Sequence, residues 1–172
     1  MPQVDFHIAS YESHAAHFAK DARSPEKRKI FDTWFDDSTA DASRHARMYE
    51  AAELLASASG SWLTIGDGRY GLDSIRIRNR GVANVLPTDI SNTLLEEAKR
   101  AGKIADYRVE NAEALSFPDG SFDYVFMKEA LHHCPRPYLA IYEMLRVARH
   151  GVIIVEPTEA GHSFARRALF RL

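Results

Sequence analysis

The sequence predicts an α/β fold in which a mainly parallel, doubly wound sheet carries helices on both faces. From residue 60 onward, short apolar runs alternate with helical segments, which is typical of a parallel sheet. The run at 62–65 leads into a loop with three glycines, as the first strand of such a sheet does. Residues 1–58 contain no strand-like run. We therefore expect a helical segment over 1–58, as a lid or outer layer, and a sheet domain over 59–172.

The strands of this sheet are predicted from short apolar runs bounded by turn residues. The last of them, GVIIVEP, is apolar throughout, as a strand buried on both faces would be. The five expected strands cover residues 62–65, 84–89, 106–110, 122–127 and 151–157.

Capping residues and apolar spacing predict the helices. Ser24-Pro25 marks a helix start, and an apolar stripe at helical spacing predicts one helix over about 41–56. Ser91 is expected to cap a helix that ends near Gly102, and a helix from about Pro137 to Ala148 precedes the fifth strand.

The composition limits the classes of partner. The net charge of −2 gives no basic surface for nucleic acid, and no apolar stretch approaches the ~20 residues that span a bilayer. A single cysteine, Cys134, suits a reducing compartment. We see no N-terminal signal peptide. These features predict a cytoplasmic protein that acts on a small-molecule substrate, without a nucleic-acid or membrane partner.

The loop after the first predicted strand reads Gly66-Asp-Gly-Arg-Tyr-Gly71, a G-x-G-x-x-G pattern. Asp89 follows Gly68 by 21 residues and ends the second predicted strand. A carboxylate there can accept hydrogen bonds from both hydroxyls of a ribose. These two features predict an adenosine site but leave NAD, FAD and S-adenosylmethionine open, and a plain tight turn remains the alternative.

The stretch ENAEALSFPDGSFDYVFMKEALHHCPRP, residues 110–137, resembles the class I S-adenosylmethionine-dependent methyltransferases. The likeness is to the small-molecule branch that includes ubiquinone and menaquinone biosynthesis enzymes. It rests on Asn111-Ala112-Glu113, on LSFPD and SFD, and on Leu131-His132-His133. The later stretch EMLRVARHGVIIVEP is similar to the helix and fifth strand of the family, with one proline and one glycine of the family pattern missing. The resemblance covers about residues 60–157 and implies a Rossmann-like fold.

In the glycine loop and second strand, the resemblance implies contacts along the whole cofactor. Gly66, Asp67 and Gly68 would line its methionine portion. Asp89 would hold the ribose hydroxyls, and Ile90 would pack on the adenine.

Further contacts are implied after the third and fourth strands. Asn111 stands where the family usually has Asp and would bond the adenine amino group through its carbonyl oxygen. Ala112 would flank the ring. Met127 and Lys128 would face the sulfonium, although Lys128 also fits a solvated turn residue.

The sequence departs from the family pattern at three places. Thr64 replaces the acid of the first strand, and Tyr70 replaces the third loop glycine, with Gly71 one place later. The family sheet has two further strands that this sequence lacks. We expect either a fragment of a longer protein, or a fifth-strand edge covered by the N-terminal helices or by a partner subunit, as in a homodimer.

Methyl transfer to oxygen or nitrogen needs a proton acceptor in many cases. The predicted catalytic bases are His132 and His133, which follow the fourth strand near the expected methyl position. The alternative is that each histidine only stabilises its turn. Glu129 is a weaker candidate.

Other polar and aromatic residues carry weaker signals. His14 and His17 lie three apart, but an exposed helix face accounts for them better than a metal pair does. Tyr11, Trp34, Arg47 and Tyr49 lie in the possible lid and could reach the site, but core or surface packing is the favoured role for each. No metal site is predicted.

The combined features predict S-adenosylmethionine-dependent methyl transfer to a small-molecule or sugar-type acceptor, by in-line displacement with base assistance. An NAD-linked oxidoreductase that uses the glycine loop is one alternative. A non-catalytic module that binds S-adenosylmethionine is the other.

Overall fold

A parallel sheet forms the centre of the molecule. The computed structural model describes residues 6–33, 35–36, 38–57 and 59–157. Within them the strand order is β3-β2-β1-β4-β5, and every pair of neighbours is parallel. This confirms the predicted α/β fold. The strands are β1 (Ser61–Ile65), β2 (Asn84–Asp89), β3 (Arg108–Val109), β4 (Phe122–Lys128) and β5 (Ala148–Val155).

The register of the three middle strands places their carboxyl ends side by side. Ile65, the last residue of β1, pairs with Thr88 of β2 and with Met127 of β4. The loops that follow these strands therefore start from one edge of the sheet. In open parallel sheets this edge is where ligands bind.

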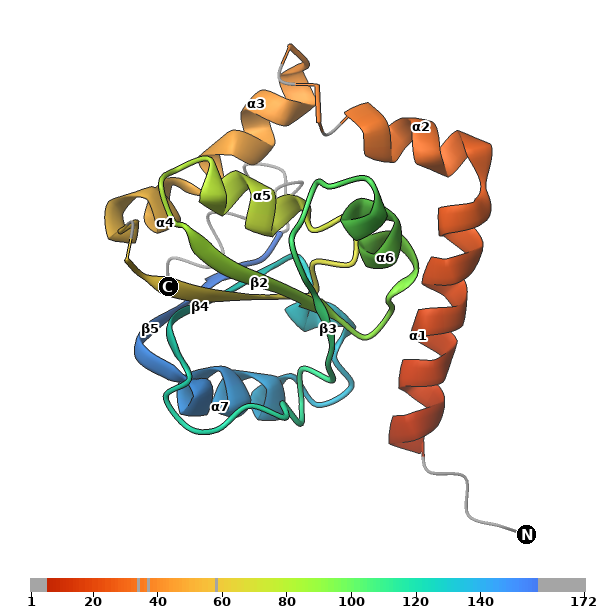
Figure 1. Cartoon of the computed structure of the whole chain (residues 1–172). Helices are drawn as coiled ribbons and strands as arrows, with labels where there is room; N and C mark the ends of the chain where they lie inside the picture. Colours follow the sequence, from red (N-terminus) through yellow and green to blue (C-terminus); the bar gives the residue numbers. More distant parts are fainter. Residues whose placement is uncertain (1–5, 34, 37, 58, 158–172) are drawn as a thin grey trace, which may run out of the picture.

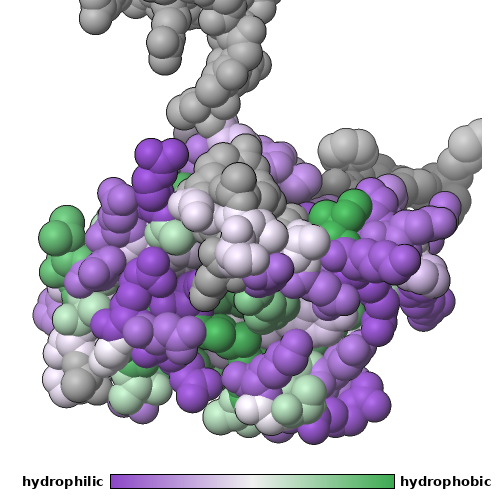
Figure 2. Space-filling view, turned by 90° about the horizontal axis from the view of Figure 1, so that it is seen from above, coloured by the Kyte–Doolittle hydropathy of each residue, from purple (hydrophilic) through white to green (hydrophobic). Residues whose placement is uncertain are grey.

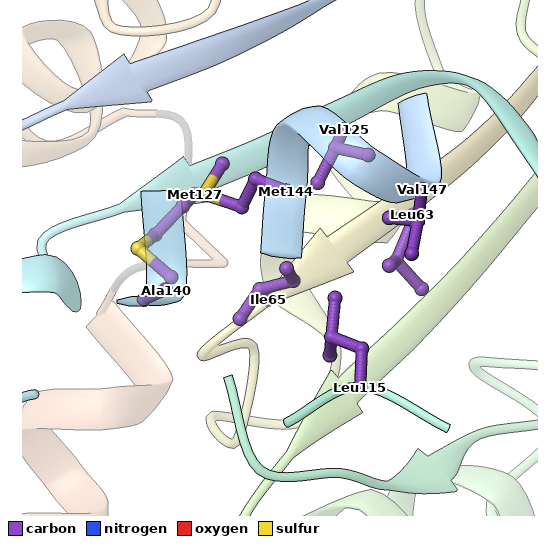
Figure 3. Packing of buried hydrophobic residues seen from close by; sticks show 8 residues of the cluster. All are labelled: Leu63, Ile65, Leu115, Val125, Met127, Ala140, Met144 and Val147. Atoms are coloured by element: carbon purple, nitrogen blue, oxygen red, sulfur yellow. The ribbon is translucent and has the colours of Figure 1, made fainter. Parts of the chain in front are cut away.

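Helices cover both faces of the sheet (Figure 1). On one face lie α5 (Leu72–Arg78) and α6 (Thr93–Arg100), and α7 (Pro137–Val147) lies on the other. Between the sheet and α7, eight buried side chains from β1, β4, α7 and a loop pack together (Figure 3). Burial of apolar surface on both faces is the main force that fixes the order of the layers. The eight are Leu63, Ile65, Leu115, Val125, Met127, Ala140, Met144 and Val147.

The N-terminal segment consists of α1 (Phe6–Arg23), α2 (Pro25–Thr33), α3 (Ala40–Arg47) and α4 (Glu50–Leu55). α1 runs along the side of the sheet domain next to α6, and α2 continues across the top (Figure 1). The guanidinium of Arg28 on α2 donates two hydrogen bonds to Glu97 on α6, at 2.7 and 3.3 Å. This ion pair ties the segment to the sheet domain.

The prediction of one helix over 41–56 is wrong, because the chain turns between α3 and α4. At this turn the N–H groups of Met48 and Tyr49 donate to carbonyl groups three residues back. The side chain of Tyr49 is buried against Phe126, and its hydroxyl donates to Asp73. A continuous helix would not place this ring in the core, so the tertiary contact overrides the local pattern.

Three other boundaries differ from prediction. The N-cap of α6 is Asn92 rather than Ser91, whose N–H donates to Asp89 instead. The ladder of β3 is only two residues long. β5 starts at Ala148, well before Gly151, and its apolar end is half-buried rather than buried on both faces. β5 has only β4 as a neighbour in the described sheet, which accounts for its partial exposure.

The face seen in Figure 2 is largely hydrophilic, with hydrophobic side chains in small separate patches. Within the described part of the chain, none of the helices combines the length and apolar character needed to cross a bilayer. Residues 158–172, including the end of the predicted sheet domain, lie outside the described residues, as does Trp34.

Candidate functional site

A pocket lies at the carboxyl ends of β1, β2 and β4. Most of the residues predicted to bind a cofactor line it together, although they are spread over more than 60 positions of the sequence. The predicted residues in its wall are Gly66, Asp67, Gly68, Asp89, Ile90, Ala112, Met127, Lys128 and His133. Asn111 and His132 are not among the lining residues.

Asp89 ends β2 with its carboxylate held by the backbone. Oδ2 accepts a hydrogen bond from the N–H of Gly68 at 2.9 Å, and Oδ1 accepts one from the N–H of Ser91 at 2.8 Å. Burial raises the pKa of Asp89 to about 6, although these two bonds favour the ionised form. Each oxygen thus has one backbone donor and retains a lone pair for a hydroxyl group of a ligand.

The carboxylate of Asp89 lies so close to the loop that only glycine fits at position 68. A Cβ at position 68 would lie 2.6 Å from Cγ of Asp89 and 2.7 Å from Oδ2. No side chain fits there while the N–H of residue 68 bonds Asp89. The 21-residue spacing seen in the sequence therefore corresponds to a direct contact.

The loop also contains backbone conformations that favour glycine. Gly66 has φ +76°, and a Cβ on it would lie 2.3 Å from Cβ of Ala130. Tyr70, which stands where the family has a glycine, has φ +60°. Its ring packs with Phe35 at 6.0 Å and lies under the ammonium of Lys103 at 5.1 Å. These contacts offset the strain of the left-handed conformation.

Asp67 serves the fold of the loop. It is 2% exposed, and its carboxylate accepts hydrogen bonds from the hydroxyl of Thr64 and from the N–H groups of Asp73 and Ser74. The carboxylate therefore binds the first turn of α5, where unpaired N–H groups favour an anion. Burial, and then the neighbouring Asp73, raise the pKa of Asp67.

Lys128 is buried rather than a solvated turn residue, which corrects the alternative kept for it. Its side chain is 6% exposed, and Nζ lies 3.2 Å from Glu129 and 3.8 Å from Asp73. Asp73 also accepts the hydroxyl hydrogen bond of Tyr49. Burial raises the pKa of Asp73, although Lys128 and Tyr49 oppose that change. Tyr49 and Lys128 thus form a buried polar network beneath the pocket.

At the expected adenine end, Ile90 and Ala112 line the pocket. The side-chain oxygen of Asn111 instead accepts a hydrogen bond from the N–H of Glu113 at 2.9 Å. That bond stabilises the local turn. A contact of Asn111 with adenine stays a prediction.

The two histidines after β4 have different environments. His132 is on the outer side, where its Nδ1 lies 2.5 Å from Oε2 of Glu156. The other oxygen of Glu156 accepts the N–H groups of Ala130 and Leu131. His133 lines the pocket, and its ring lies 4.0 Å from that of His132. Burial, and then His132 and His14, lower the pKa of His133.

The wall opposite His133 comes from α1. Tyr11 and His14 both line the pocket, and the rings of His14 and His133 lie 4.9 Å apart. His17, one turn later, is 76% exposed beside Asp21. His14 is therefore not part of an exposed face with His17. No group of three or more metal-binding side chains occurs in the part of the chain that the structure describes.

Sequence reasoning missed several lining residues: Arg69, Asp73, Glu110 and Cys134. The position of Cys134 directly after the two histidines was the available signal for it. Burial raises the pKa of its thiol to about 12, so the group is protonated at neutral pH. Cys134 is a lining residue without nucleophilic character.

The model of the methyltransferase domain family matches residues 63–155, which include β1 to β5 almost completely. The chain belongs to the class I S-adenosylmethionine-dependent methyltransferases. The match begins after the N-terminal helices, so α1 is outside it.

Two methyltransferases are similar to this chain in sequence. One is 2-methyl-6-phytyl-1,4-hydroquinone methyltransferase of Synechocystis sp., 38% identical over 99 residues, with 54% of this chain and 30% of that protein covered. The other is 27-O-demethylrifamycin SV methyltransferase of Amycolatopsis mediterranei, 31% identical over 126 residues, with 69% and 46% covered. The chain thus spans less than half the length of either relative.

The fold is similar to that of the 4+2 cyclase SpnF, with a TM-score of 0.59 and 23% identity, over 71% of this chain and 48% of that one. This similarity concerns the fold alone. SpnF is named as a cyclase, so the proteins with this fold include one that is named for a reaction other than methyl transfer.

Proposed function

We propose that this protein transfers the methyl group of S-adenosylmethionine to a hydroxyl or similar nucleophilic group of a small organic molecule. The observation that carries the proposal is the pocket in which Gly68, Asp89, Ile90 and Ala112 converge. The family match supports S-adenosylmethionine over NAD. The small organic acceptor is supported by the names of the two relatives, a hydroquinone and a rifamycin methyltransferase.

The residues at the ribose end fit this cofactor. Asp89 offers two oxygens that the backbone holds in place, and vicinal hydroxyl groups are suitable donors for them. Ile90 and Ala112 supply an apolar surface for the adenine. When bound, the cofactor supplies a methyl group that its positively charged sulfur activates for displacement. Holding it in one orientation is a large part of catalysis in such a reaction.

We assign the proton acceptor to His132, which lies behind the pocket lining with its ring 4.0 Å from that of His133 in the pocket wall. Glu156 accepts a hydrogen bond from Nδ1 of His132, which leaves Nε2 with the lone pair that takes the proton. The proton of the acceptor hydroxyl passes to Nε2, and the carboxylate of Glu156 stabilises the imidazolium that forms. Burial in the pocket wall lowers the pKa of His133, which makes it less suited to take up a proton. We assign it to the wall that contacts the acceptor.

Transfer of a radiolabelled methyl group from S-adenosylmethionine to 1,4-hydroquinone, as a simple probe, tests this function. We expect the wild type to label the probe and His132→Gln to lower kcat by about 10²–10⁴-fold, the usual contribution of a general base. Glu156→Gln should lower kcat less and should change the pH profile. His133→Gln should raise KM while the pH profile keeps its shape.

The comparison of the two histidine variants decides the assignment. An equal loss of kcat in His133→Gln, with an unchanged rate in His132→Gln, would reverse the roles. Binding of S-adenosylhomocysteine without labelling of any hydroxyl-bearing probe would favour the non-catalytic module.

A further inference from the structure

We propose that Glu129 binds the ammonium group of the cofactor's amino-acid portion. This inference rests on the proposed function and concerns the end of the pocket opposite Asp89. Thr64, which stands where the resemblance implies an acid, is uncharged and fully buried near the end of β1, so it supplies no negative charge to this end.

The order of the strands determines which residues the far end of the cofactor meets. Asp89 ends β2, the glycine loop follows β1, and Glu129 follows β4, and these three strands are neighbours in that order. A ligand whose ribose lies at Asp89 and which passes over Gly66 therefore reaches the loop after β4. Gly66 and Ala130 are in close approach there, so Glu129 lies directly beside the path.

The backbone of Glu129 has an unusual conformation. Its φ is +51°, in the left-handed region that non-glycine residues seldom adopt. The N–H of Glu129 donates to the carbonyl of Val155 on β5 at 2.8 Å, which holds this conformation. Residues that keep such strain are concentrated at ligand sites, because glycine would adopt the same backbone at lower cost. The presence of glutamate where glycine would cost less therefore indicates that the side chain of Glu129 has a function.

The other two carboxylates at this end have structural partners. Asp67 accepts three hydrogen bonds from Thr64, Asp73 and Ser74, and the carboxylate of Asp73 contacts Tyr49 and Lys128.

Glu129 lines the pocket with a side chain that is 27% exposed, and its carboxylate contacts Lys128 at 3.2 Å. Burial opposes its ionisation, but Lys128, with smaller contributions from His45 and Arg69, outweighs burial, so the pKa of the carboxyl group is lowered. Glu129 is thus a carboxylate at neutral pH with a surface open to the pocket.

Calorimetric binding of two ligands tests the assignment. S-adenosylhomocysteine carries the amino-acid portion, and 5′-methylthioadenosine has the same adenosine and thioether without it. We expect Glu129→Gln to weaken S-adenosylhomocysteine by about ten- to a hundredfold, as the loss of a charge-assisted hydrogen bond does. The affinity for 5′-methylthioadenosine should change less than about twofold. Glu96→Gln, on the exposed side of α6, is the control and should change neither affinity.

A second pair of variants separates strain from binding. Glu129→Gly relieves the left-handed backbone that Glu129→Ala keeps, and both variants lose the ion pair with Lys128. We therefore expect Glu129→Gly to have the higher Tm of the two, and both to bind S-adenosylhomocysteine more weakly than the wild type. An unchanged affinity of Glu129→Gln for S-adenosylhomocysteine, or an equal loss for both ligands, would overturn the inference. The proposed function would survive either result, whereas a wild type that binds neither ligand would overturn both.

Discussion

The two ends of the pocket are built in different ways. At the ribose end, backbone N–H groups of Gly68 and Ser91 hold Asp89, and all three residues lie within 68–91. At the opposite end, the wall consists of side chains of α1 and of the turn after β4, where His14 meets His133. The first end belongs to the family match, and α1 lies outside it.

This difference teaches which parts of the site the family fixes. A carboxylate held by backbone donors needs only the strand order and glycines at defined positions. A wall of rings from two distant segments depends on how α1 packs, and its residues can vary without a change in the sheet. We expect the ribose end to carry cofactor binding, whereas the α1 end carries the choice of acceptor.

The largest effect is expected in the glycine loop. Gly66→Ala places Cβ 2.3 Å from Cβ of Ala130 at a positive φ, so either the loop or the turn after β4 must move. We expect a loss of about 2–4 kcal/mol in the free energy of unfolding, measured with urea.

Gly102→Ala is the matched control, since Gly102 also has positive φ but no atom within 4 Å of the added Cβ. This variant should lower the free energy of unfolding by only about 1 kcal/mol, which is the strain of the left-handed backbone. Equal costs for the two variants would show that the approach of the two loops does not matter for stability.

The next effect concerns Asp89. Asp89→Asn should weaken S-adenosylhomocysteine by about ten- to a hundredfold, because the ribose hydroxyls lose a charged acceptor. Calorimetry at pH 7.5 measures this change. Glu129→Gln is expected to weaken the same ligand at its amino-acid portion, so the two variants compare the two ends of the cofactor directly.

The pKa of Asp89 adds a pH dependence to the same measurement. Hydroxyl donors favour the ionised carboxylate, whose pKa is about 6. The wild-type affinity should therefore fall as the pH is lowered through 6, and the affinity of Asp89→Asn should stay level. An equal fall in both proteins would assign the titration to another group.

A smaller effect is expected at the α1 end. The pKa of His14 is lowered by burial, and then by His17 and His132. In the unfolded chain the group binds its proton at a higher pH than in the folded protein. Stability is therefore lost as the pH falls below about 6.5 toward the folded pKa.

Replacement of this histidine tests the assignment. His14→Gln should reduce the loss of stability between pH 7 and pH 5, measured by urea unfolding at each pH. If the stability of His14→Gln falls between pH 7 and pH 5 as steeply as that of the wild type, the titrating group is another one, for example His133, whose pKa is also lowered.

The smallest effect concerns the ion pair that ties α2 to α6. Arg28 and Glu97 are 39% and 40% exposed, so solvent screens their attraction. Arg28→Gln should cost about 0.5–1 kcal/mol, partly because Arg28 Nε also donates to the carbonyl of Ala22. Lys99→Gln, which removes the more exposed pair with Asp106, should cost less. A larger cost for Lys99→Gln would contradict the proposed attachment of the N-terminal segment.

Much of the ribose end could be predicted from the sequence. The spacing between Gly68 and Asp89 follows from a strand, a loop, a helix and a second strand in the order of a parallel sheet, and the contact is local to that unit. The likeness after β3 supplied Ala112 in the same way. Such features depend on a short piece of chain and on backbone geometry.

The rest depends on tertiary contacts that no local pattern contains. The turn at Tyr49 divides a predicted helix because its ring has a place in the core and its hydroxyl a partner in Asp73. Lys128 is buried because of the same network. His14 faces the pocket rather than solvent because α1 packs beside it, and helical periodicity alone does not determine that orientation.

The most direct test of the central claim is a calorimetric titration of the wild-type protein with S-adenosylhomocysteine and, separately, with NADH. A pocket that holds the ribose at Asp89 and the amino-acid portion near Glu129 should bind S-adenosylhomocysteine with one site per chain and should not bind NADH. Binding of NADH alone would contradict the account.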